Sequence, residues 1–273
     1  MTSFTALTTM DTNERKNYMV DHGKQVLSDM LNHIGNADNE LHDKIVYRLF
    51  CEIISEELLT KELLKELIFE LPTDKYLYAN ISSTNDDTVF TRSFAALWLA
   101  CLLNYDNRQP FLTEQEAIQV MEASIHYLSK EQDVRGFVEG KGWAHSMAHG
   151  ADLAVTIVAH RHFQLRFAPI ILQGVKSALC KGTVFIDDEE ERLAKIFAKL
   201  IAIDFPEEIL IEWVEQVFDK LDVYFYEVGY TETFFHARTN TLRFIRMLYF
   251  TAKFSNKAKQ LQAVTSIFIN KWV

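Results

Sequence analysis

The stretch GKGWAHSMAHGADLAVTIVAHRHF, residues 140–163, carries the strongest structural signal in the sequence. From about Trp143 to Phe163, apolar side chains cover most of the circumference when residues are placed about 100° apart, as in an α-helix. A helix that is apolar nearly all round is stable only when other elements bury it. The stretch therefore predicts a long helix packed inside a larger helical protein.

The composition extends this prediction to the whole chain. Of 273 residues, 48% are hydrophobic, but only 9 are Gly and 4 are Pro, too few for the turns of a strand-rich fold. Similar polar-to-apolar helix starts recur near residues 92, 145 and 236, which suggests a repeat of about 45–53 residues. We expect one all-α domain over residues 1–273, an antiparallel helix-pair array forming a HEAT- or armadillo-like superhelix. A compact helical bundle is the alternative. The expected helices lie near residues 12–34, 39–59, 60–72, 90–103, 113–130, 143–163, 168–181, 187–203, 206–221, 231–254 and 256–272.

Charge and hydropathy exclude several classes of partner. The formal net charge is -10, so we expect neither nucleic acid nor a membrane as a partner. The longest apolar run, residues 94–103, is about half of what a membrane span needs. The first ten residues lack the basic and apolar segments of a signal peptide. We therefore expect a cytoplasmic protein. Its scattered cysteines predict buried free thiols instead of a disulfide framework: Cys51, Cys101 and Cys180.

One polar stripe interrupts the apolar helix. His145, His149 and Asp152 fall within about 60° of one another on the helical projection. Two histidines at i and i+4 are typical of helical zinc sites, and Asp152 is then available as a third ligand. The Glu that follows the first His in zinc proteases is replaced here by Ser146. The stripe thus indicates a structural hydrogen-bond network, a ligand pocket, or a divalent metal site at His145, His149 and Asp152.

Two other groups of polar residues are expected near the stripe. Arg92 opens the apolar helix at 90–103, and a buried guanidinium needs a carboxylate partner. The candidates are Asp86, Asp87 and Asp152. His236 shares a helix face with Asn240 and Arg243, which is either solvated or part of the concave surface of a stacked array. In the second case one ligand-binding groove is lined by Arg92, Trp143, His145, His149, Asp152 and His236.

The remaining signals are weaker. The acidic run at 187–191 begins a helix, where carboxylates stabilise the helix dipole, so it needs no further role. Glycine lets a backbone or a ligand approach closely. Four of the nine glycines gather around the His/Asp stripe and favour a site there: Gly136, Gly140, Gly142 and Gly150. The sequence contains no nucleotide-binding glycine loop, nucleophile elbow or Cys/His zinc spacing.

Two segments carry a family resemblance. DTVFTRSF at residues 87–94 and GKGWAHSMAHGADL at residues 140–153 resemble the bacterial family catalogued as domain of unknown function 2785. The segments occur in the family's order, and the resemblance covers most of the chain. It implies an all-helical, armadillo-like cytoplasmic protein and assigns no activity. The residues that match its signature are Arg92, Trp143, His145, His149 and Asp152.

Three hypotheses about function follow. The first is a helical-repeat protein that binds a small polar ligand or a peptide in the six-residue groove described above. The second is a metal-dependent hydrolase that uses His145, His149 and Asp152 or His236 as ligands, with Glu139 as an acid–base group. The third is a scaffold in which the stripe only ties helices together. A divalent metal is the cofactor of the second hypothesis alone.

Overall fold

The computed structural model describes residues 3–38 and 40–272. Residues 1, 2, 39 and 273 lie outside it, including the expected start of the second helix and both ends of the expected domain. The N-terminal half contains η1 (Ser3–Thr9), α1 (Thr12–Asn32), the π-helix η2 (Glu40–Tyr47), α2 (Arg48–Ser55), α3 (Lys61–Glu70), α4 (Thr88–Arg108), α5 (Glu114–Ser124) and α6 (Tyr127–Lys130). The C-terminal half contains β1 (Phe137–Val138), β2 (Gly142–Trp143), α7 (Ser146–Ala159), η3 (Leu165–Phe167), α8 (Ala168–Ala178), α9 (Glu189–Ala202), α10 (Glu207–Val228), α11 (Glu232–Ser255) and α12 (Lys259–Trp272). The fold is all-α, as predicted, apart from these two short strands.

Several helices begin where the sequence supplies a capping side chain. Asp11 at α1 and Thr113 at α5 each form a capping box with the glutamate three residues later. Thr60 and Thr231 cap α3 and α11 by accepting hydrogen bonds from backbone amides of the first turn. Because these bonds join residues only three positions apart, they determine the helix starts independently of the tertiary structure.

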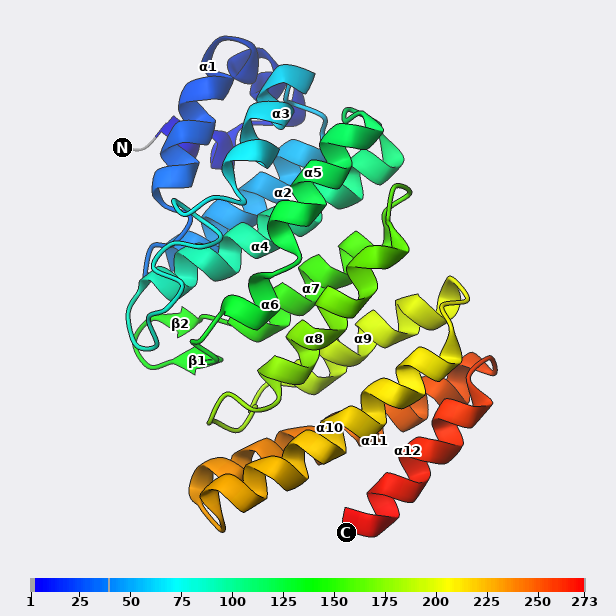
Figure 1. Ribbon diagram of the computed structural model, residues 1–273. Coiled ribbons are helices and arrows are strands. Elements are labelled where there is room, and N and C mark those ends of the chain that lie inside the picture. The colour runs from blue at the N-terminus through cyan, green and yellow to red at the C-terminus, as the bar shows by residue number, and fades with distance from the viewer. Residues whose placement is uncertain (1–2, 39, 273) are drawn as a thin grey trace.

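The helices pack in two rows that run from one end of the molecule to the other (Figure 1). In one row α7 packs between α4 and α9, and α9 also packs against α11. In the other row α8 contacts α6, and α10 contacts α12. Hydrogen bonds also join elements that are far apart in the chain: Ser93 and Ala144 are separated by 51 positions, and Phe185 and Asn240 by 55.

Helix α7 lies in the middle of the hydrophobic core. Eleven of its 14 residues are buried, which confirms the prediction of a helix buried on nearly all sides. Gly150 allows α6 to approach closely, since an added Cβ would lie 2.7–2.9 Å from side-chain atoms of Tyr127 and Leu128. Among the described residues, no helix is both long and apolar enough to cross a membrane.

The structure corrects three of the expectations. The helix expected at 143–163 begins only at Ser146, because the preceding residues pair as a β-hairpin in which Phe137 lies opposite Trp143. It ends at Ala159, since His160 has an extended backbone conformation. The helix expected at 113–130 divides into α5 and α6 near Ile125. The three thiols are free, as expected, but they are only partly buried.

Candidate functional site

Two helix starts with an unusual backbone conformation delimit the candidate site. His145 precedes α7 with φ 51° and ψ 31°, and Asp188 precedes α9 with φ 58° and ψ 27°. This left-handed conformation costs roughly 1–2 kcal/mol for residues other than glycine. Such strain concentrates at functional sites of proteins. The two starts belong to adjacent elements, because α7 packs directly against α9.

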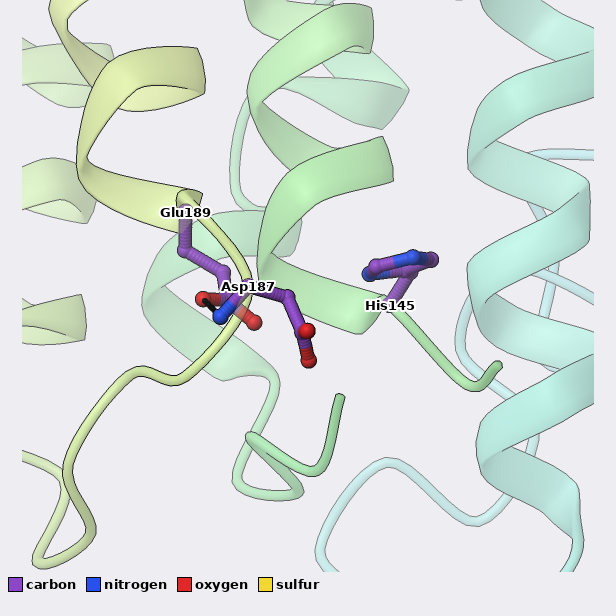
Figure 2. Close-up of side chains that lie close together, drawn as sticks. All are labelled: His145, Asp187 and Glu189. Atoms are coloured by element: carbon purple, nitrogen blue, oxygen red, sulfur yellow. Dashed lines mark hydrogen bonds between the residues drawn. The ribbon is translucent and has the colours of Figure 1, made fainter. Parts of the chain in front are cut away.

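His145, Asp187 and Glu189 form a cluster at these helix starts (Figure 2). One nitrogen or oxygen atom from each side chain lies within 4.8 Å of the others. Glu189 is 1% exposed, and its Oε2 accepts a 2.8 Å hydrogen bond from the Asp187 amide. Burial raises the pKa of the Glu189 carboxyl. Asp187 Oδ2 is also buried, and no group in the described part of the chain donates a hydrogen bond to it.

Gly136 provides the space for these carboxyl groups. A Cβ at this position would overlap Oδ2 of Asp187 and would lie 3.2 Å from Oε1 of Glu189. Its carbonyl oxygen accepts a 2.8 Å hydrogen bond from the amide of Ala144, which fixes the loop beside the β-hairpin. The gathering of glycines around the His/Asp stripe thus has a physical reason at residue 136, where only glycine leaves room for Asp187.

An aromatic surface flanks the cluster on the hairpin side. The ring of Trp143 is stacked on His145, with centroids 4.3 Å apart and planes 5° from parallel. Phe137 packs edge-on against Trp143 at 5.0 Å and is 52% exposed. The His145 imidazole is therefore held between an aromatic face and the two carboxyl groups of Asp187 and Glu189, and the β-hairpin, not α7, sets its orientation.

His149 lies deeper than His145, at the interface of α7 with α4. Its Nδ1 lies 2.8 Å from Oγ of Ser93, and its ring packs edge-on against Phe94 at 5.3 Å. Because Ser93 Oγ donates its one proton to the Ala144 carbonyl, it accepts a hydrogen bond from Nδ1–H of His149. The two imidazole rings are 5.5 Å apart. His145 and His149 are therefore neighbours, as the helical projection predicted. The projection assumed that both lie within one helix, whereas His145 is the residue just before α7.

Arg92 is the most buried of the expected ligand-binding residues. Its Nε and Nη2 donate to the two carboxylate oxygens of Glu131 at 2.7 and 2.8 Å, and both side chains are fully buried. Its Nη1 donates to the carbonyl oxygen of Ala79 at 2.9 Å. The expectation that the partner is Asp86, Asp87 or Asp152 was wrong. The chain that follows α6 passes over the start of α4 and places Glu131 there instead.

Asp152 and His236 also have partners of their own. Asp152 forms an ion pair with Arg192 on α9, and burial raises the pKa of its carboxyl group. Nδ1 of His236 lies 2.8 Å from the carbonyl oxygen of Gly182, within hydrogen-bond distance.

The residues that share a helix face with His236 support the loop before α9. Asn240 accepts a 2.9 Å hydrogen bond from the amide of Phe185, and Arg243 donates to the Phe185 carbonyl at 2.9 Å. Asn240 is buried on this face, whereas the Arg243 side chain is 51% exposed. The face holds the segment that leads to Asp187 and Glu189.

The structure thus regroups the expected site. Of the six expected ligand-binding residues it brings together Trp143, His145 and His149. Arg92, Asp152 and His236 pair elsewhere. Among the described residues, the one group of side chains able to hold a metal ion retains only His145 of the expected set. Sequence reasoning missed Asp187 and Glu189 because the helix dipole explains an acidic run at a helix start. The only signal for them was their position about 45 residues after His145, the spacing of a helical repeat.

Comparison with known proteins gives one result. A family model described as Protein of unknown function (DUF2785) matches residues 77–250, which include every residue of the cluster and of the hairpin. The chain belongs to this family. No curated protein and no solved structure matches the chain. The description of the family assigns no activity, so function has to be argued from the chemistry of the site.

Proposed function

We propose that this protein binds a divalent transition-metal ion through His145, Asp187 and Glu189. The observation that carries the proposal is the buried Oδ2 of Asp187, which lacks a hydrogen-bond donor within the described residues and lies beside an imidazole and a second buried carboxyl group. A buried carboxylate oxygen is costly unless a cation or a donor compensates it. A metal ion bound by all three side chains supplies that compensation.

The types of ligand atom favour one class of metal. One imidazole nitrogen with two carboxylate oxygens suits Zn²⁺, Mn²⁺ or Fe²⁺, whereas Ca²⁺ and Mg²⁺ prefer oxygen ligands only. Ligands bound at roughly 2.1 Å in a tetrahedral site are about 3.4 Å apart, so small rotations of the three side chains are sufficient. Three protein ligands leave a position for water or a substrate, as in catalytic zinc sites.

This open position supports the hydrolase hypothesis with a changed set of ligands. A bound metal ion lowers the pKa of a coordinated water and polarises a carbonyl or phosphoryl oxygen. Glu139, the acid–base group of that hypothesis, is exposed at the tip of the hairpin between β1 and β2. Its role remains a prediction, as does the metal set of His145, His149 and Asp152.

Metal content and affinity test the proposal directly. Protein purified without chelator is analysed by inductively coupled plasma mass spectrometry, and chelator-treated protein is titrated with Zn²⁺ and Mn²⁺ in a calorimeter. We expect near-stoichiometric binding that Asp187→Asn and His145→Gln each weaken at least tenfold. Asp188→Asn is the matched control, because it removes a neighbouring exposed charge and asparagine tolerates the left-handed conformation. Equal binding by all variants, or no binding by the wild type, contradicts the proposal.

The aromatic surface supports a second candidate, the binding of a small polar ligand without metal. The stacked Trp143 and His145 and the half-exposed Phe137 offer a flat apolar surface next to hydrogen-bonding carboxyl groups. Trp143 and His145 are the members of the expected groove that such a ligand would contact. Native mass spectrometry separates the candidates, since it reports either a metal ion or an organic ligand retained by the protein.

Three further predictions belong to the proposal. The two rows of helices, and hydrogen bonds between residues 51 and 55 positions apart, support a HEAT- or armadillo-like superhelix. A cytoplasmic location stays a prediction, with which the three free cysteines, widely spaced in the sequence, are compatible. The net charge of -10 argues against nucleic acid or an anionic membrane as the main partner.

A further inference from the structure

The charges of the chain are distributed very unevenly along the sequence. From residue 233 to the C-terminus there are seven Lys or Arg residues and no Asp or Glu, whereas residues 1–232 contain all 38 acidic residues and 21 basic ones. In this protein of net charge -10, the helices α11 and α12 thus carry six basic residues and only one acidic residue, Glu232 at the first position of α11. These helices form the C-terminal end of the stack in Figure 1.

A groove between α11 and α12 is lined by three of these seven basic residues. Two adjoining hollows share Tyr249 and Ser266, so they form one continuous groove along the two helices. Its lining includes the cations Arg246, Lys253 and Lys259 and no acidic residue. Within the described residues, none of these three cations forms an ion pair.

Apolar side chains accompany the cations. Tyr249, Phe250 and Ile269 line the groove, and Phe250 is 45% exposed. Phe254 stacks on Phe250 at the edge of the groove and is 74% exposed. Exposed aromatic rings beside unpaired cations are typical of protein interaction sites.

The groove lies on the free face of the helix row. On α11, Arg246, Tyr249 and Lys253 are on the side opposite Phe244, at about 100° per residue. Phe244 packs against Phe197 of α9 at 5.4 Å, so it marks the side that faces the preceding helix. The helices α4, α7 and α9 each have the next helix of the row on the corresponding side. On this side α11 is bordered by α12, and in the described part of the chain no further helix follows α11 in its row.

We propose that the groove between α11 and α12 binds an acidic amphipathic helix of a partner protein. The apolar lining fits the apolar face of such a helix, the cations fit its acidic residues, and the site is where the row would receive its next helix. A long polyanion suits the groove less well than a short helix, because beyond the groove it meets the acidic remainder of the protein. The proposal does not depend on the metal site.

Fluorescence anisotropy with two peptides tests the proposal. The probe is a labelled amphipathic peptide of about four helical turns with leucine at i, i+3, i+4 and i+7 and glutamate elsewhere. The control probe has lysine in place of glutamate. We expect the acidic probe to bind at least tenfold more tightly than the lysine probe, and less tightly at about 300 mM than at about 50 mM salt. Equal affinity for the two probes overturns the proposal.

Charge-reversal variants test whether the acidic probe binds in the groove. Arg246→Glu combined with Lys253→Glu is expected to weaken the acidic probe at least tenfold, and both residues are exposed, so the fold is retained. Lys16→Glu combined with Lys61→Glu is the matched control, since it makes the same change in charge at exposed residues of α1 and α3. We expect no change of affinity there. Equal weakening by both double variants overturns the assignment to the groove.

Binding of any of three other partners in the groove would overturn the proposal. Phosphatidylserine vesicles or a single-stranded oligonucleotide that bind the groove more tightly than the acidic peptide identify a polyanion as the partner. A dimer in native mass spectra that is lost in the Arg246→Glu, Lys253→Glu variant identifies a second copy of the chain.

Discussion

Replacing Glu131 with glutamine is expected to destabilise the protein strongly, although the two side chains have nearly the same shape. Glu131 accepts two bonds from Arg92, one from the Tyr127 hydroxyl at 3.1 Å and one from the Asp133 amide at 2.9 Å. Both charged side chains are 0% exposed. Breaking such a pair leaves the Arg92 charge buried and uncompensated, which costs about 3–5 kcal/mol of the free energy of unfolding. At roughly 2 °C per kcal/mol for a chain of this length, Tm falls by about 6–10 °C.

Urea denaturation followed by circular dichroism measures this loss. Glu122→Gln is the matched control, because Glu122 pairs with Arg166 at an exposed site and its loss is expected to cost less than about 1 kcal/mol. Arg92→Met combined with Glu131→Leu is expected to cost less than the sum of the two single changes, since no charge remains buried. A Glu131→Gln variant as stable as the wild type, or additive single changes, would refute this account of the pair.

Three further predictions concern single positions. Gly136→Ala is expected to weaken Zn²⁺ binding at least tenfold in calorimetry, because the new Cβ overlaps the position of Asp187 Oδ2; unchanged affinity would show that Asp187 is not a ligand. Gly23→Ala is expected to raise the free energy of unfolding by about 0.5–1 kcal/mol in urea, because it favours the α1 helix and its Cβ would make only ordinary contacts at 3.5 and 3.6 Å; a loss of stability contradicts this. Burial lowers the pKa of Lys181 to about 8. Above that pH the unfolded chain therefore binds more protons than the native one. The free energy of unfolding of the wild type, measured against that of the Lys181→Met variant, is expected to rise between about pH 8 and 10. A difference that does not change with pH would exclude this shift.

The helices could be predicted from local patterns because the interactions that start them are local. The capping boxes at Asp11 and Thr113 lie where the sequence indicates, and so does the buried character of α7. The start of α7 could not be predicted in the same way. The β-hairpin pairing of Phe137 with Trp143, and the left-handed His145, shorten the helix by three residues relative to the expected start. Neither feature interrupts the apolar pattern.

The candidate cluster overlaps only in part with the residues that the sequence indicated. The glycines around residue 140 and His145 lie in or beside the cluster, whereas Asp187 and Glu189 were not among the predicted site residues. The sequence predicted the wrong ion-pair partners for Arg92. It also contained no pattern that marked the acidic run at 187–191 as part of a site. A helical projection compares residues within one helix, whereas Glu131 reaches Arg92 across 39 positions and Glu189 reaches His145 across 44. Such pairs depend on which helices pack together.

The all-α class, most helix positions, the buried central helix and the uneven distribution of charge can be recognised in the amino-acid sequence alone. These follow from composition and from periodicity, which depend on residues a few positions apart. Which polar side chains meet depends on how the helices pack in three dimensions. The packing of α7 against α9 places Asp187 and Glu189 beside His145. The chain that follows α6 passes over α4 and places Glu131 beside Arg92. A buried charge needs a partner in space, and the backbone path, not distance along the chain, selects that partner.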